Sequence, residues 1–125
     1  MTEKILLIED NEQNRILMRQ ILVRHGYDLL EAKDGLIGIK MARAHMPALI
    51  LLDIQMPVMN GFMVIHELRN DAELKKIKVI AVTSFAMKGD RERALEAGFD
   101  EYVTKPIDTR KFPELVKQIL TGVQP

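Results

Sequence analysis

The chain has 125 residues, which suits one domain, and 47% of them are hydrophobic, which is enough for a folded core. Its 18 Lys and Arg residues balance 18 Asp and Glu residues, and a net charge of zero argues against a general nucleic-acid binder, which needs a basic stripe. The absence of Cys excludes disulfides, zinc–thiolate sites and thiol nucleophiles.

Short apolar runs alternate with longer amphipathic segments along the chain. The runs at 5–8 and 49–52 are too short for helices, and their continuous apolar character is typical of strands buried on both faces of a parallel sheet. The expected elements are, in chain order, a strand over 5–8, a helix over 12–25, a weaker strand over 27–32, a helix over 34–46, a strand over 49–52, a helix over 60–70, a strand over 77–82, a helix over 90–97, a weaker strand over 102–104 and a helix opened by Asp108.

Capping residues and apolar spacing support the helices. Asp10 and Asn11 can cap the first helix, Gly26 can end it, and Gly98 can end the fourth. The last helix carries one apolar stripe at i, i+3, i+4 and i+7, made of Phe112, Leu115, Val116 and Ile119.

This alternation predicts a doubly wound α/β fold, a (βα)5 sandwich around a five-stranded parallel sheet. We expect one domain over residues 1–125, with no output domain after the last helix and a frayed tail over 122–125. No apolar run approaches the length of a membrane span, and the N-terminus lacks the apolar core of a signal peptide. We therefore expect a cytoplasmic protein that does not associate with a membrane.

Chemically active side chains follow the predicted strands. In open parallel sheets, ligands bind beyond the carboxyl ends of the strands, so these side chains should converge on one edge. The residues after the strands are Glu9, Asp10, Asp53, Thr83, Ser84 and Lys105. We expect three carboxylates, one hydroxyl and one ammonium group among them to converge.

Three carboxylates this close need a cation or raised pKa values, because like charges about 4 Å apart repel by about 4 kcal/mol per pair at an effective dielectric near 20. Oxygen ligands select a hard ion, and Mg²⁺ is the usual choice beside a phosphoryl group. A carboxylate nucleophile next to Mg²⁺ forms an aspartyl phosphate, with Lys and Thr holding phosphoryl oxygens. The cluster therefore predicts phosphoryl transfer to an Asp.

Taken singly, each of these residues has a plainer interpretation. Glu9 and Asp10 could cap a helix, Asp53 could be a turn residue, and Tyr102 could be an ordinary half-buried strand residue. The joint arrangement favours the functional interpretation of the acids, whereas for Tyr102 both interpretations stay open.

Four motifs in this order resemble the receiver domain of bacterial response regulators over essentially the whole chain. The segment over 85–90 is also similar to stand-alone receivers of the CheY and DivK type and to receivers of hybrid kinases. The resemblance implies the flavodoxin-like fold of CheY. The motifs are Ile8-Glu9-Asp10-Asn11, Leu52-Asp53-Ile54-Gln55-Met56-Pro57 with Asn60-Gly61, Val82-Thr83, and Thr104-Lys105-Pro106.

The resemblance implies a phosphoacceptor and a metal site. Asp53 would accept the phosphoryl group, and Mg²⁺, for which Mn²⁺ can substitute, would bind Asp53 and Asp10 directly. Glu9 would be a ligand either directly or through water, and the backbone carbonyl of Gln55 would be a further ligand. Glu9 replaces the commoner Asp of the family, and its longer side chain should change the ligand geometry slightly.

The resemblance also implies a switch. Lys105 would contact a phosphoryl oxygen, and Thr83, with Ser84 beside it, would bind another on activation. Tyr102 would be the switch aromatic that turns inward as Thr83 moves, and the Lys105–Pro106 bond would be cis.

Two positions are expected to tune the lifetime of the phosphorylated form. Gln55 and Phe85 occupy the family positions that influence how fast water reaches the acyl phosphate. A bulky Phe85 should shield it and slow dephosphorylation, so an unchanged decay rate in Phe85→Ala would contradict this hypothesis.

The implied function is a single-domain response regulator, not an enzyme, that changes its affinity for a protein partner. The donor would be a sensor histidine kinase or a histidine phosphotransfer protein, docking near Asn14, Arg15, Met18 and the loop at Pro106 and Ile107. The downstream partner would bind the face made by the fourth helix, the fifth strand and the fifth helix, and the protein would be a monomer or weak dimer.

Two other function classes compete with this interpretation. Aspartyl-phosphate phosphatases of the haloacid-dehalogenase type need a second Asp two residues after the nucleophile, where this chain has Gln55, which cannot act as an acid. The other alternative is a receiver fold used for constitutive docking, which has no need for the charge cluster.

Overall fold

The computed structural model describes residues 2–84 and 88–122. In these residues five strands and five α-helices alternate, and one short 3-10 turn precedes the fourth strand. The elements are β1 (Lys4–Ile8), α1 (Glu12–Arg24), β2 (Asp28–Ala32), α2 (Gly35–His45), β3 (Leu49–Asp53), α3 (Gly61–Arg69), η1 (Leu74–Lys76), β4 (Lys78–Thr83), α4 (Asp90–Ala97), β5 (Glu101–Thr104) and α5 (Lys111–Thr121). The predicted (βα)5 order is confirmed.

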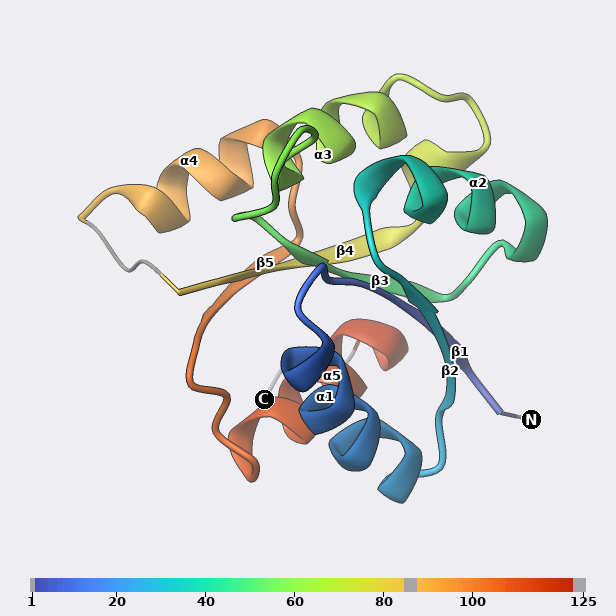
Figure 1. Ribbon diagram of the computed structural model, residues 1–125, viewed down its shortest axis with the longest axis vertical. Coiled ribbons are helices and arrows are strands. Elements are labelled where there is room, and N and C mark those ends of the chain that lie inside the picture. Colours follow the sequence, from blue (N-terminus) through green and yellow to red (C-terminus); the bar gives the residue numbers. More distant parts are fainter. Residues whose placement is uncertain (1, 85–87, 123–125) are drawn as a thin grey trace.

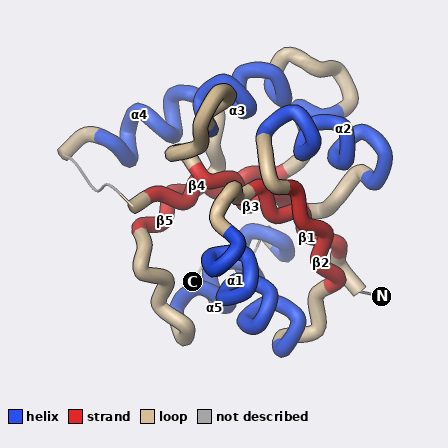
Figure 2. The backbone as a smooth tube through the Cα atoms, viewed as in Figure 1, coloured by secondary structure: helices blue, strands red, loops and turns tan. Residues whose placement is uncertain are grey.

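The strands form one parallel sheet in the order β2-β1-β3-β4-β5. Helices α1 and α5 cover one face of it, and α2, α3 and α4 cover the other (Figure 1). The tube view shows the sheet as a layer between the two helical layers (Figure 2). The strand order reverses between β1 and β3, and such a switch point opens a crevice beyond the carboxyl ends of those strands.

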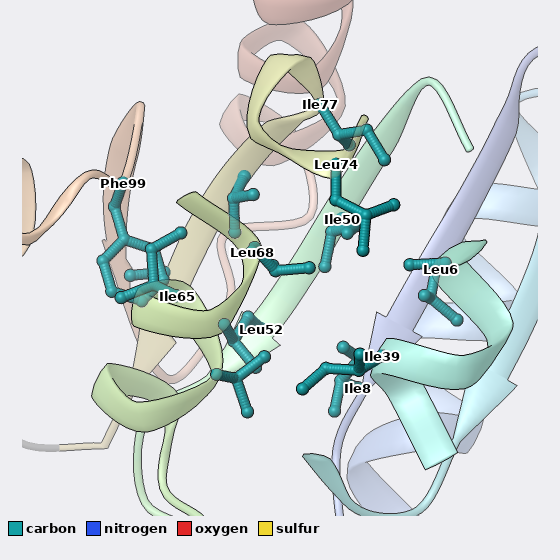
Figure 3. Close-up of a cluster of buried hydrophobic side chains, with 14 of the residues drawn as sticks. Leu6, Ile8, Ile39, Ile50, Leu52, Ile65, Leu68, Leu74, Ile77 and Phe99 are labelled. Carbon is teal, nitrogen blue, oxygen red and sulfur yellow. The ribbon is translucent and has the colours of Figure 1, made fainter. Parts of the chain in front are cut away.

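Both faces of the sheet are buried, because successive side chains of a strand point to opposite faces. In β1, Leu6 and Ile8 belong to the core under α2 and α3, whereas Ile5 and Leu7 belong to the core under α1 and α5. Figure 3 shows the first of these clusters, in which the strand residues lie against Ile39, Ile65 and Leu68 of the helices. This two-sided burial explains why the strands are continuously apolar in sequence.

Helix starts follow the predicted caps, with small shifts. The side chain of Asn11 accepts the N–H of Asn14 at 3.0 Å, so Asn11 is the cap of α1. The last helix begins later than expected, because the carboxylate of Asp108 accepts the N–H groups of Arg110 and Lys111 in a turn before α5. Among the described residues, no helix is both long enough and apolar enough to cross a membrane.

Candidate functional site

Three carboxylates meet at the carboxyl edge of the sheet, at the switch point. Glu9 and Asp10 follow β1, and Asp53 is the last residue of β3. Oxygens of the three groups all lie within 4.8 Å of one another. Glu9 and Asp53 are buried, whereas Asp10 is exposed. The cluster is therefore closed on the core side and open to solvent on one side.

One ammonium group faces the carboxylates. Lys105, which follows β5, places its Nζ 2.7 Å from an oxygen of Glu9 and 3.6 Å from an oxygen of Asp53. The peptide bond from Lys105 to Pro106 is cis. One positive charge thus stands against three carboxylates, so the cluster keeps an excess of negative charge whenever all three are ionised.

This excess is visible in the pKa values. Burial, together with the neighbouring Glu9, raises the pKa of Asp53 to about 7. Burial also acts to raise the pKa of Glu9, but the hydrogen bond from Lys105 and the contacts with Asp53 and the Asn11 N–H outweigh it, so that pKa is lowered. Burial and the charge of Glu9 raise the pKa of Asp10. Without a further cation, Asp53 is only partly ionised near neutral pH.

The donor set fits a hard divalent cation. The three carboxylates offer only oxygen as ligand atoms, which suits Mg²⁺ and not a soft metal. The N–H of Asn11 donates to Glu9 at 3.2 Å and the N–H of Gln55 donates to Asp53 at 3.3 Å, which fixes the direction of both buried carboxylates. A bound cation would offset the burial and the effect of Glu9 that together raise the pKa of Asp53.

The chain turns tightly after Asp53, and Gly61 makes this turn possible. The N–H of Gly61 donates to the carbonyl of Ile54 at 3.0 Å. A Cβ atom at Gly61 would lie 2.7 Å from the Cα of Ile54 and 2.8 Å from the carbonyl oxygen of Asp53, closer than real side chains come. The start of α3 therefore packs directly on the backbone that carries Asp53.

The side chain of Gln55 is turned toward the end of β4. Its amide nitrogen donates to the hydroxyl of Thr83, and its amide oxygen accepts the N–H of Ser84 at 3.0 Å. Thr83 is buried, whereas Ser84 is exposed. The loop after β3 is thus tied to the end of β4 through one side chain, a link that the sequence did not indicate.

Tyr102 lies beside this link. It is half-buried on β5, pairs with Ala81 in the sheet and lines a pocket of about 250 Å³ together with Gln55, Thr83 and Asp90. The placement is compatible with both interpretations of Tyr102, as a switch aromatic and as a strand residue. The expectation for Phe85 falls outside the residues that the structure describes.

A second pocket, of about 350 Å³, adjoins the carboxylates between α1 and the loop after β5. Asn14, Met18 and Ile107 are among its lining residues, in the region where the donor was expected to dock. Met18 is only 4% exposed, so it belongs to the core and offers little contact surface. Arg15 does not point into this pocket; its side chain folds back onto the loop after β1.

Known proteins that resemble this chain in sequence and in structure are receiver domains and response regulators. Residues 5–117 match the model of the response regulator receiver domain. The chain is 44% identical over 120 residues to the polar-differentiation response regulator DivK of Brucella ovis, covering 96% of this chain and 98% of the relative. The DivK protein of Brucella anthropi is 43% identical over the same length, with the same coverage.

Solved structures agree with the fold. CheY4 of Vibrio cholerae superposes with a TM-score of 0.88 at 21% identity, covering 95% of this chain and 99% of that protein. The receiver domain of a sensor histidine kinase from Pseudomonas aeruginosa, which holds a magnesium ion in its active-site cleft, superposes with a TM-score of 0.88 at 29% identity, covering 97% and 99%. The CheY-like fold that the motifs implied is confirmed, and the chain belongs to the family of response regulator receiver domains.

Proposed function

We propose that this receiver domain is a Mg²⁺-dependent switch that accepts a phosphoryl group on Asp53 and then changes its affinity for a protein partner. The observation that carries the proposal is the buried carboxylate of Asp53 at the open edge of the sheet, 3.6 Å from Lys105 and beside two further carboxylates. A scaffold with no chemistry to perform has no use for this excess of buried negative charge.

The reaction is a transfer between two nucleophiles. A carboxylate oxygen of Asp53 attacks the phosphorus of a phosphohistidine, the P–N bond breaks, and the imidazole leaves with a proton taken from solvent. Lys105 is placed to hold an oxygen of the incoming group, because its Nζ already lies within 4 Å of Asp53. Asp53 must be ionised to attack, and its raised pKa makes that requirement depend on charge compensation.

Glu9, Asp10, Asp53 and the backbone carbonyl of Gln55 would hold the Mg²⁺ ion, as oxygen ligands suited to it. When bound, the ion supplies positive charge that stabilises the ionised carboxylate and the oxygens of the transferred group. The magnesium in the cleft of the Pseudomonas aeruginosa receiver supports this assignment, because that domain is 29% identical to this chain and shares its fold.

Thr83 would convert the phosphoryl group into a change of shape. Its hydroxyl is bonded to Gln55, and binding a phosphoryl oxygen instead would require that link to be remade. Thr83 and Tyr102 line one pocket with the first residue of α4, so a shift of Thr83 can reach the face formed by α4, β5 and α5. We assign the downstream protein partner to that face, and a histidine kinase or histidine phosphotransfer protein to the phosphodonor role.

The test is the intact mass of the protein after incubation with acetyl phosphate, with and without Mg²⁺, for the wild type and for Asp53→Asn. The proposal expects one added phosphoryl group on the wild type, only with Mg²⁺, and none on the variant. If neither acetyl phosphate nor a phosphorylated histidine donor modifies the wild type, the proposal is wrong, and the fold then serves as a constitutive docking module.

A further inference from the structure

The guanidinium group of Arg15 is bonded to the backbone of the acidic loop. Arg15 lies in the first turns of α1, and its Nη1 donates to the main-chain carbonyl of Glu9 at 2.9 Å and to that of Asp10 at 3.1 Å. These two consecutive peptide groups carry the two carboxylates that follow β1. One cationic donor therefore fixes the backbone of both residues at once.

Arg15 is itself held from the other side by β2. Its Nε lies 3.8 Å from the carboxylate of Glu31, and Arg19, one turn further along α1, makes a two-pronged bond to the same carboxylate at 2.7 and 2.9 Å. The side chain of Arg15 is only 19% exposed. Glu31 thus lies near Arg15 without a hydrogen bond to it, and the hydrogen bonds of Arg15 run to the loop after β1.

We infer that Arg15 is a positioning residue for the divalent cation site, an inference that rests on the proposed function. Each carboxylate can point toward a shared cation only if the peptide groups that carry it keep their orientation. Partners that orient metal ligands from behind typically change metal affinity about 10- to 100-fold when removed. We expect loss of Arg15 to raise the dissociation constant for Mg²⁺ about tenfold.

The direction of the change in Mg²⁺ affinity distinguishes two possible roles of Arg15, as a positioning residue and as a nearby positive charge. If Arg15 acted only as a nearby positive charge, its removal would leave the acidic cluster more negative and would tighten Mg²⁺ binding. If it orients the ligands, its removal weakens Mg²⁺ binding in spite of the added negative potential. The two accounts therefore predict opposite changes.

Arg19 provides a matched control. It carries the same charge on the same helix and binds the same Glu31, but its bonds run to that carboxylate and not to the loop after β1. Arg19→Met removes one positive charge, as Arg15→Met does. A difference in Mg²⁺ affinity between the two variants can therefore be assigned to the hydrogen bonds from Arg15 to the carbonyls of Glu9 and Asp10.

The experiment is a calorimetric titration of the full chain with MgCl₂, for wild type, Arg15→Met, Arg15→Gln and Arg19→Met. A metal-free measurement accompanies it: hydrogen exchange at the amide of Asn11, which donates to Glu9 at 3.2 Å. We expect both Arg15 variants to bind Mg²⁺ about tenfold more weakly and to exchange faster at Asn11, and Arg19→Met to match the wild type. Arg15→Gln decides the matter if Arg15→Met does not fold.

Two results would overturn the inference in different ways. If the wild type binds Mg²⁺ and the Arg15 variants bind it as tightly as Arg19→Met or more tightly, Arg15 is not a positioning residue, and the proposed function stands. If the wild type binds no Mg²⁺, the proposed metal site is wrong, and the role of Arg15 falls with it.

Discussion

The two edges of the sheet handle their charges in opposite ways. At the amino ends of β4 and β5, Arg69 from the end of α3 donates to Asp100 and to three main-chain carbonyls, those of Gly98, Lys75 and Ile77. Asp100 in turn accepts the N–H of Val79 at 2.8 Å. At the carboxyl edge, three carboxylates lie near the ammonium group of Lys105.

The comparison separates a charge that stabilises the fold from charges that the proposed cation would balance. Arg69 joins α3, the 3-10 turn and the segment before β5, and it has an acceptor for each contact. The carboxylate cluster is arranged at a cost in stability, since burial and repulsion raise the pKa of Asp53. Mutations at the amino edge should therefore change the free energy of unfolding under all conditions. Mutations at the carboxyl edge should change how that free energy depends on pH and on divalent cations.

The largest effect is expected at the structural edge. Arg69→Met removes four hydrogen bonds and leaves Asp100 without that cation, so the free energy of unfolding should fall by about 3 kcal/mol, whether or not Mg²⁺ is present. Urea unfolding measures it. Arg43→Met is the control, because Arg43 is 58% exposed and its ion pair with Asp71 should contribute no more than about 0.5 kcal/mol. Equal losses in both variants would contradict the comparison.

The next effect is the pH dependence of the metal-free protein. Folding raises the pKa of Asp53 to about 7, from about 4 in the unfolded chain, so the stability linked to its protonation is fully present below about pH 4 and is lost as pH rises to about 7. Asp53→Asn removes this loss. By urea unfolding in EDTA, the variant should be more stable than the wild type at pH 8, by an amount that falls almost to zero at pH 4. A difference that does not change with pH would contradict the assignment.

Addition of Mg²⁺ should narrow that difference. A ligand present at ten times its dissociation constant stabilises the folded state by about 1.4 kcal/mol, so the wild type should gain this amount. Asp53→Asn, which lacks one of the proposed ligands, should gain much less. A thermal unfolding series in MgCl₂ checks both, and equal gains in the two proteins would remove Asp53 from the metal site.

The smallest effect concerns the link between the loop after β3 and β4. Gln55→Ala removes the bonds to Thr83 and Ser84, which together should lower the free energy of local opening by about 1 kcal/mol. The amide of Ser84 should then exchange about fivefold faster, while the free energy of global unfolding changes little. Unchanged exchange at Ser84 would mean that Gln55 does not restrain the end of β4.

Much of the fold could be predicted, because two-sided burial leaves a direct mark on the sequence. Leu49 to Leu52 are fully buried, and their strand was placed to within one residue. The apolar run predicts a strand over 77–82, whereas β4 is Lys78–Thr83. Ile77 ends the 3-10 turn, and the polar Lys78 is the first residue that pairs with β3, opposite Leu49. Backbone pairing, which composition does not reveal, sets that boundary.

The sequence predicted which residues lie together at the site, because the order of the strands decides that, but not how their long side chains are bonded. Parallel strands place Glu9, Asp53 and Lys105 at one edge whatever their side chains do. The bonds of Gln55 to Thr83 and of Arg15 to the acidic loop depend on which way a long side chain turns, and only the packed structure decides that. For Arg15 a signal did exist, since a residue one turn into a helix can reach back to the loop before it.

The most direct test of the central claim is to locate the phosphoryl group chemically. After reaction of the wild type with a small phosphodonor and Mg²⁺, borohydride reduces an aspartyl phosphate to homoserine, and peptide mass spectrometry finds the position. The account predicts homoserine at Asp53 alone and only when Mg²⁺ is present. Homoserine at another carboxylate, or none in a sample that has gained a phosphoryl group, would contradict the assignment of Asp53 as the acceptor.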